Sequence, residues 1–420
     1  MICINTILVH SFSLTTGIDS FTGTAGADTF GASLVFDATE AVTTASTIAV
    51  PDTIVGGAGV DTLNMTISGA QDAAVTIPAA GISGVETFNV RNTVAQTATL
   101  DATNFAGLTA ANADRSIGAL TVTGMTAAAS GGVTGDGVTT NGATSFGWGA
   151  TVTSGAVNIA NGATAGAVTT AGTLLATNTV NSTGAANTIG ALTLGAAVTT
   201  LNVNAATALT TGAVTNTGAA ALTKINVTGA GAVNLSATAQ QSTVTTIDAS
   251  GSTGGLTVAL GTAVTQKVTG SSGNDVITTG AVLTTGSVDA GAGVDVLDIG
   301  TNVSHVNTTA LAAKYTNFET VRIGAAALDM SLIGGINAVQ LTGAATLTNM
   351  TATQAAAVTA RANIGNASLA LATATGTSDV LTITNGLGTT TAAATTIGTL
   401  VATGFETINL AANPGPSATT

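Results

Sequence analysis

Residues 191–235 read ALTLGAAVTTLNVNAATALTTGAVTNTGAAALTKINVTGAGAVNL, and this stretch decides the fold class. Small apolar side chains alternate there with Thr or Asn in the segments Leu192-Thr-Leu194, Leu201-Asn-Val203, Ile225-Asn-Val227 and Val233-Asn-Leu235. Alternation of this kind is typical of strands that bury one face, and the Gly, Ser and Asn residues between the segments form turns. We therefore predict very short strands with no room for helices of useful length between them.

The same alternation extends outward in both directions, for example at Leu120-Thr-Val122 and Leu256-Thr-Val258. The apolar centres recur roughly every 8 to 12 residues, a spacing that suits either a β-sandwich or a β-solenoid. Small side chains, very short strands and the lack of a domain-sized break favour the solenoid, in which each coil buries its inner face against the next. The predicted fold is all-β, a right-handed parallel β-solenoid with β-roll-like coils of irregular length. Tandem β-sandwich domains are the alternative.

Composition limits the function. The 420 residues include 20 acidic side chains and only 7 Lys or Arg, so the formal net charge is -13. Binding to nucleic acid needs clustered basic residues, so we expect no such partner. We also expect no membrane insertion, because no run approaches the ~20 apolar residues that span a bilayer. The chain has two histidines, His10 and His305, and no catalytic motif, so we expect no enzyme and an exposed loop position for His305.

Charge also divides the chain. Acidic residues are frequent from Asp19 to Asp114 and again from Asp248 onward, whereas no charged residue occurs between Asp136 and Lys224. We predict three modules: residues 1–114, a charge-poor β-repeat region at 115–247, and residues 248–420.

Four stretches share a Gly-rich turn that ends in Asp and precedes an apolar alternation: Gly23-Thr-Ala-Gly26-Ala-Asp28-Thr-Phe30, Gly56-Gly57-Ala-Gly59-Val-Asp61-Thr-Leu63, Gly270-Ser-Ser-Gly273-Asn-Asp275-Val-Ile277 and Ala290-Gly291-Ala-Gly293-Val-Asp295-Val-Leu297. Glycine permits positive φ in a tight turn and lets carbonyl oxygens point inward. Together with an Asp carboxylate, these oxygens are the hard ligands that Ca²⁺ prefers. The other interpretation is an ordinary turn in which the Asp caps backbone amides.

The second stretch matches the nonapeptide G-G-x-G-x-D-x-U-x in full. On these turns the sequence resembles the repeats-in-toxin (hemolysin-type) calcium-binding family, and more closely the Gly/Thr/Ala-rich surface-layer proteins and adhesins of Gram-negative bacteria. The resemblance implies Ca²⁺ between the turns of neighbouring coils. Asp275 and Asp295 are 20 positions apart, close to one coil, whereas Asp28 and Asp61 are 33 apart and need an insertion. The implied ligand set is Asp28, Asp61, Asp275, Asp289 and Asp295, with Gly26, Gly57, Gly59, Gly273, Gly291 and Gly293.

A second repeat contains three of the four glutamates: Gly84-Val-Glu86-Thr-Phe88, Asn317-Phe-Glu319-Thr-Val321 and Gly404-Phe-Glu406-Thr-Ile408. Each Glu could be a calcium ligand or a lateral contact. We favour a turn residue whose carboxylate accepts hydrogen bonds from backbone amides at the start of a strand.

The resemblance implies a function as well. We expect a secreted, calcium-dependent structural protein of the bacterial cell surface, a surface-layer subunit or a fragment of one. Self-association into a lattice is the expected partnership, and a cell-surface polysaccharide is a further partner to consider. The alternative is a secreted adhesin, or the non-catalytic repeat region of a larger type I exported protein.

Overall fold

The computed structural model describes residues 9–37, 39, 41–70, 72–216, 218, 221–386 and 396–411. The protein is all-β, with 48% of residues in strands and 5% in helices, and its parallel coils, about 15 in all, stack as a β-solenoid. This confirms the predicted solenoid. The β-sandwich alternative is wrong, because every pairing between named strands in the described residues is parallel, the single antiparallel contact being an isolated bridge between Phe36 and Val42.

The chain forms two compact units, residues 1–238 and 239–420. The three modules at 1–114, 115–247 and 248–420 remain a prediction.

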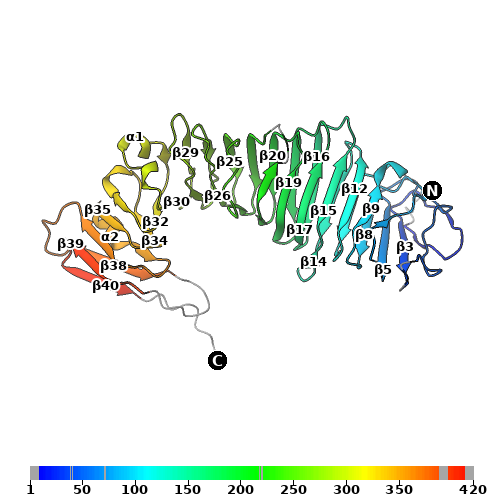
Figure 1. The fold of residues 1–420 in the computed structure, drawn as a ribbon, viewed down its shortest axis with the longest axis horizontal. Helices are drawn as coiled ribbons and strands as arrows, with labels where there is room; N and C mark the ends of the chain where they lie inside the picture. The colour runs from blue at the N-terminus through cyan, green and yellow to red at the C-terminus, as the bar shows by residue number, and fades with distance from the viewer. Residues whose placement is uncertain are drawn as a thin grey trace, which may run out of the picture. The chain divides into compact units, whose positions relative to one another are not determined.

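Unit 1 contains three sets of parallel strands. Figure 1 shows the strands of successive coils lying side by side, for example β5 and β8. Its first sheet comprises β1 (Ser11–Ser13), β3 (Thr29–Phe36), β5 (Thr62–Gly69), β8 (Thr87–Asn92), β11 (Ala110–Asp114), β13 (Ser130–Thr134), β16 (Ser154–Ala160), β18 (Thr177–Thr183), β20 (Thr200–Ala205) and β23 (Lys224–Gly229). The second comprises β6 (Val75–Thr76), β9 (Ala98–Asp101), β12 (Leu120–Met125), β14 (Thr140–Asn141), β15 (Thr144–Trp148), β17 (Thr164–Ala171), β19 (Asn187–Leu194), β21 (Leu209–Thr211), β22 (Val214–Asn216) and β24 (Val233–Leu235). A short third sheet holds β2 (Ser20–Thr22), β4 (Thr53–Val55), β7 (Gly81–Ser83) and β10 (Phe105–Ala106), preceded by the 3₁₀ turn η1 (Ala102–Asn104).

Unit 2 repeats this plan with shorter strands. One sheet holds β25 (Thr246–Ser252), β27 (Lys267–Thr269), β29 (Ser287–Asp289) and β31 (Tyr315–Thr316). A second holds β26 (Leu256–Ala259), β28 (Val276–Thr278), β30 (Val296–Gly300), β32 (Thr320–Ile323), β34 (Ala338–Leu341), β36 (Val358–Ala360), β38 (Val380–Asn385) and β40 (Thr407–Ala411). A third holds β33 (Ala327–Asp329), β35 (Thr346–Met350), β37 (Ala367–Leu371) and β39 (Leu400–Thr403).

Besides η1 in unit 1, the described helices lie in loops of unit 2: η2 (Val303–His305), α1 (Thr309–Ala312), η3 (Met330–Leu332) and α2 (Ala352–Ala356). In the part of the chain that the structure describes, no helix is long and apolar enough to span a bilayer. The structure corrects one detail, since His305 is buried in η2 rather than exposed in a loop. Burial lowers the pKa of its imidazole.

The core consists of side chains stacked in register from coil to coil. In β5, Leu63, Met65 and Ile67 point inward and the residues between them point outward, as the alternation predicts. One inner row of the first sheet passes through Phe30, Leu63, Phe88, Ala111, Gly131, Val157, Val180, Val203 and Val227. Each apolar side chain therefore loses its contact with water against its counterparts in the adjacent coils, which contributes roughly 25 cal/mol per Å² of buried apolar surface.

The interruption of this row at Gly131 has a packing cause. A Cβ atom at Gly131 would lie 2.3 Å from the ring of Phe146, which enters from β15. Gly155 makes the same kind of space for Trp148, whose ring would lie 2.6 Å from an added Cβ. At these two positions a glycine therefore makes room for a large aromatic side chain in a core of mostly small residues.

Candidate functional site

The acidic residues of the Gly-Asp turns lie at one corner of successive coils, each immediately before a strand. In unit 1, Asp28 precedes β3, Asp61 precedes β5 and Glu86 precedes β8. The backbone N–H of Asp28 donates to Asp61 Oδ1 (2.6 Å), and the N–H of Asp61 donates to Glu86 Oε2 (2.8 Å). The carboxylate of each coil thus caps the amide of the corresponding acid one coil earlier. We call Asp28, Asp61 and Glu86 the unit 1 ladder.

Unit 2 contains the same arrangement, the unit 2 ladder of Asp275, Asp295 and Glu319. Asp275 precedes β28, Asp295 precedes β30 and Glu319 precedes β32. The N–H of Asp275 donates to Asp295 Oδ1 (2.7 Å), and the N–H of Asp295 donates to Glu319 Oε2 (2.8 Å). All four ladder aspartates are 0% exposed. In the described residues the only ion pairs are Asp114–Arg115 and Asp298–Arg322, so neither ladder is neutralised by a basic side chain.

The glutamate motif closes each ladder, and its predicted role as an acceptor of backbone amides is confirmed. Glu406 acts in the same way, since its Oε2 accepts the N–H of Asp379 (2.8 Å). Two residues before each Glu the backbone takes a left-handed conformation, with φ of 61° at Gly84, 59° at Asn317 and 84° at Gly404. Gly and Asn tolerate this conformation best, which explains the first position of the motif.

The two turns of each pair differ at the fourth residue before the Asp. In the first turns this residue is Thr24 or Ser271, and both its backbone N–H and its hydroxyl donate to the Asp carboxylate. The amides of Gly26 and Gly273 in turn donate to these hydroxyls (3.1 Å each). Both carboxylate oxygens of Asp28 and Asp275 are therefore satisfied, with His10 N–H and Leu256 N–H as further donors at 2.6 Å.

In the second turns the corresponding residue is Gly57 or Gly291, which has no hydroxyl. The Oδ2 atoms of Asp61 and Asp295 are buried and have no hydrogen-bond partner. A buried carboxylate oxygen without a donor costs free energy, so a cation would be favourable at these two atoms, as it would at Asp379 Oδ2, which is likewise buried and without a partner.

Glycine is required in the second turns because they stack directly on the first. Gly57 and Gly59 have φ of 109° and 117°, and Gly291 and Gly293 have φ of 94° and 146°. A Cβ atom at Gly57 would lie 2.2 Å from Thr24 O, and one at Gly293 would lie 2.5 Å from Gly273 O. The expectation of positive φ thus holds for the second turns, whereas Gly26 and Gly273 of the first turns do not have it.

Asp289 lies outside the ladder, at the end of β29. Its Oδ1 accepts hydrogen bonds from Gly291 N–H (3.1 Å) and from the Asn317 side chain (2.7 Å). Its charge nevertheless acts on the ladder. The pKa of Asp295 is raised to about 6, first of all by burial and also by the neighbouring carboxylates of Asp275, Glu319 and Asp289, against the lowering effect of the hydrogen bond from the Asp275 amide.

The two first-turn acids differ in the direction of their pKa shifts. Burial raises the pKa of Asp275, whereas the hydrogen bond from the Thr24 amide holds the pKa of Asp28 below its usual value.

Sequence reasoning missed three acids that use the same capping bond. Asp19 N–H donates to Asp52 Oδ1 (3.0 Å) at the start of β2 and β4, and Asp379 begins the pair with Glu406. None of the three stands in a Gly-x-Gly-x-Asp turn. A simpler sequence pattern identifies them, because each of these acids comes immediately before a short apolar alternation.

The fit of Ca²⁺ can be judged from the donor atoms. In the described residues no group of three or more His, Cys, Asp or Glu side chains is placed to hold a metal. An ion would therefore use one carboxylate together with backbone carbonyl oxygens, as hard cations do in glycine-rich turns. Asp61 meets this requirement, since a Cβ atom at Gly56 would touch both Asp61 Oδ2 (2.6 Å) and Gly84 O (1.7 Å). Of the predicted ligands, Asp61 and Asp295 keep a free oxygen, and Asp28 and Asp275 do not.

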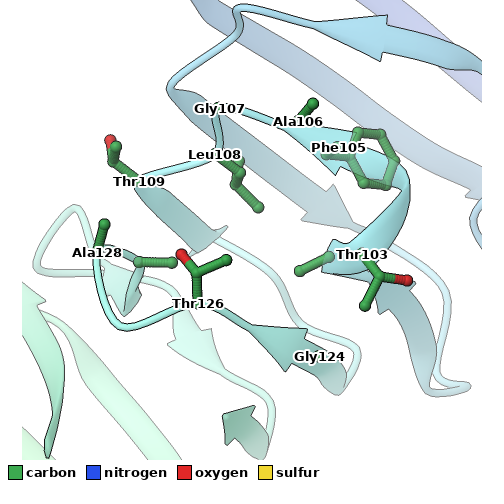
Figure 2. Close-up of a pocket in the computed structure, with 11 residues that line it drawn as sticks. Thr103, Phe105, Ala106, Gly107, Leu108, Thr109, Gly124, Thr126 and Ala128 are labelled. Carbon is green, nitrogen blue, oxygen red and sulfur yellow. The ribbon is translucent and has the colours of Figure 1, made fainter. Parts of the chain in front are cut away.

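A separate pocket of about 380 Å³ lies beside η1 and β10 (Figure 2). Phe105, Leu108, Thr103 and Thr126 line it together with Ala and Gly residues. None of its lining residues, all in the described part of the chain, has an ionisable side chain. The pocket therefore offers no group for acid–base chemistry or for metal binding.

No protein-family model matches this chain, and no curated protein matches its sequence.

Proposed function

We propose that the protein is a calcium-dependent structural component of a bacterial cell surface, a surface-layer subunit or a part of one, that assembles with copies of itself. The observation that carries the proposal is the pair of buried, unpartnered oxygens at Asp61 Oδ2 and Asp295 Oδ2. The parallel coils support it as well, because a stack of coils presents extended, regular faces to neighbouring molecules.

Calcium would act on two levels in this proposal. Bound at Asp61 and Asp295, it would neutralise carboxylates that no basic side chain of the described residues reaches. Between molecules, it would screen or bridge the surfaces of subunits that each carry a formal charge of -13.

Thermal unfolding followed by far-UV circular dichroism tests the first level. We expect the melting temperature to rise with millimolar Ca²⁺ relative to EDTA, to rise much less with Mg²⁺, and to lose the Ca²⁺ response in the Asp61→Asn/Asp295→Asn double variant. Identical melting temperatures in EDTA and in Ca²⁺ would mean that the turns are stabilised by hydrogen bonds alone. That result would contradict the calcium dependence in the proposal.

Negative-stain electron microscopy tests the second level. We expect two-dimensional arrays in Ca²⁺ and dispersed molecules in EDTA. A protein that binds Ca²⁺ but stays monomeric at high concentration would contradict the surface-layer proposal and favour the adhesin or repeat-region alternative.

A further inference from the structure

A groove of about 230 Å³ opens on the outer face of the first sheet of unit 1, and it contains no ladder residue. Strands β5 and β8 and the end of β11 form it. Its polar lining consists of Asn64, Thr66, Asn89, Arg91, Asp114 and Arg115. We call it the arginine groove.

The floor of the groove belongs to a row of hydrogen-bonded asparagines. Asn64, Asn89 and Asn112 face one another in register, and each side-chain amide donates to the preceding carbonyl, with both Nδ2–Oδ1 distances at 2.9 Å. After Gly132 the row continues through Asn158, Asn181 and Asn204. The amides of Asn89, Asn112, Asn181 and Asn204 each use one N–H along the row and keep a second one for a ligand. These donors repeat at the strand spacing of about 4.8 Å.

The groove also concentrates positive charge in an acidic protein. Unit 1 has three basic side chains, Arg91, Arg115 and Lys224, and two of them line this groove. Arg91 is exposed, and its guanidinium makes no hydrogen bond or ion pair with any residue that the structure describes.

Arg115 is held in place by its neighbour. Its backbone is left-handed (φ 48°), and its guanidinium forms a two-point contact with Asp114, with Nε–Oδ1 at 3.1 Å and Nη2–Oδ2 at 2.7 Å. The hydrogen bond and the charge of Asp114 raise the pKa of Arg115. This leaves Nη1 of Arg115 and the whole guanidinium of Arg91 to receive an anion.

We propose that the arginine groove binds a carboxylate-bearing sugar unit of an acidic polysaccharide. The Arg91 guanidinium would hold the carboxylate in a two-point contact, the geometry that suits arginine better than lysine. The sugar hydroxyls would bond to the free amide hydrogens of Asn64 and Asn89, and further units would follow the asparagine row.

The polar character of the groove favours a polysaccharide over a protein partner. Protein interfaces depend on a few buried aromatic or aliphatic anchors. The only large apolar residue in the lining is Met65, which is itself buried in the core. The inference deepens the proposed function by naming a partner class, but the groove is independent of the calcium turns, so binding is measured in both EDTA and Ca²⁺.

Isothermal titration of the full chain with trigalacturonate, maltotriose and inorganic phosphate tests the proposal. We expect trigalacturonate to bind in either buffer, with an affinity that falls as salt rises. Maltotriose should bind at least about tenfold more weakly, a difference of ~1.4 kcal/mol. Arg91→Gln should weaken trigalacturonate binding about tenfold, and Arg91→Lys should recover only part of the loss.

Lys224→Gln is the matched control, because it removes the third basic side chain of unit 1 from an exposed position on the same sheet. It should leave the affinity unchanged, and circular dichroism should show that all variants are folded. Three results would overturn the proposal: no binding of trigalacturonate, equal weakening by Arg91→Gln and Lys224→Gln, or phosphate binding as tightly as trigalacturonate through Arg91. The last would make the groove a simple anion site.

Discussion

The two ladders reach the same corner chemistry from differently spaced residues. Successive acids are 33 and 25 positions apart in unit 1, but 20 and 24 positions apart in unit 2. In both ladders the first Asp receives a hydroxyl hydrogen bond, the second keeps an unpartnered oxygen, and the third acid is Glu. The length of a coil is therefore free to vary in its loops, whereas the corner is fixed by the bond from an amide to the next carboxylate.

The ladders differ in what they offer a cation. Unit 1 has Gly56 beside Asp61 Oδ2, where a carbonyl oxygen also approaches, whereas Ala290 stands at the corresponding sequence position in unit 2. Unit 2 instead gathers more negative charge, since Asp289 acts on Asp295 in addition to Asp275 and Glu319. We infer that the room left by Gly56 beside Asp61 favours ion binding in unit 1. In unit 2, ion binding is favoured by the attraction of the additional carboxylates around Asp295.

The largest expected effect is a break in the stacking of the turns. Gly57→Ala places a Cβ atom 2.2 Å from Thr24 O in a left-handed conformation, so we expect a loss of about 3–5 kcal/mol in the free energy of unfolding. Urea unfolding followed by Trp148 fluorescence measures it, because Trp148 is the single tryptophan of the chain and lies in unit 1.

Gly137→Ala is the control for this change. Gly137 also has a positive φ (76°), but an added Cβ atom would meet nothing within 4 Å. It should cost only the ~1–2 kcal/mol of the left-handed conformation. Equal losses for the two variants would mean that the turns are not stacked as described.

The second prediction separates the two aspartates of unit 1. Asp61→Asn should abolish the Ca²⁺-dependent rise in the melting temperature of unit 1, followed by Trp148 fluorescence, because it removes the charge of the unpartnered oxygen. With free Ca²⁺ at 100 times Kd, that rise corresponds to about 2.7 kcal/mol, or roughly 5–10 °C. Asp28→Asn should keep the response, since both oxygens of Asp28 already have donors. A response lost only in Asp28→Asn would place the ion at the other turn.

Much of this corner could be predicted from the sequence, because it depends on local patterns. The alternation around Leu63 correctly predicts a strand, and the Gly-rich turns correctly predict the corners of the coils. The position of Glu86 at the start of a strand correctly predicts that its carboxylate accepts a backbone amide. The partners of the carboxylates could not be predicted. Which amide meets Asp61 depends on how the coil that contains the 33-position interval stacks, and a single sequence does not determine that register.

The arginine groove was missed for the same reason. Its members Asn64, Asn89, Arg91 and Arg115 come from three coils, and they share a face only once the strands are paired in register. The burial of His305 was missed because the irregular loop around η2 has no period from which an inward direction can be read.

The third prediction uses pH to sharpen the contrast between the ladders. The pKa of Asp295 is raised in the folded protein to about 6, so its contribution to stability is fully present below the unfolded pKa and is lost as pH rises through 6. Without metal, Asp295→Asn should therefore be more stable than the wild type at pH 7, by on the order of 1 kcal/mol after solvent screening, and the difference should vanish near pH 4.

The pKa of His305 is lowered in the folded protein, so its contribution to stability is lost as pH falls, which is the opposite direction. Because His305 is present in both the variant and the wild type, its contribution cancels in the difference between their free energies of unfolding. Asp28 has a lowered pKa, so its contribution is lost only as pH falls below the range of unfolded aspartate. Calcium should abolish the advantage of Asp295→Asn at pH 7. A pH-independent difference between Asp295→Asn and the wild type would contradict the raised pKa.

The smallest expected effect tests why the first turns carry a hydroxyl. Ser271→Ala removes the Oγ–Oδ1 hydrogen bond of 2.6 Å, but the backbone amides of Ser271 and Leu256 still donate to Asp275. We expect a loss of about 0.5–1.5 kcal/mol in the free energy of unfolding, measured in urea, and no new response to Ca²⁺, because neither oxygen of Asp275 becomes unpartnered. Ser271→Thr should restore the stability, since Thr24 performs this role in unit 1. A gain of Ca²⁺ response in Ser271→Ala would instead show that the hydroxyl alone keeps the ion out of the first turns, and that the glycine at the corresponding position of the second turns is a requirement of binding as well as of stacking.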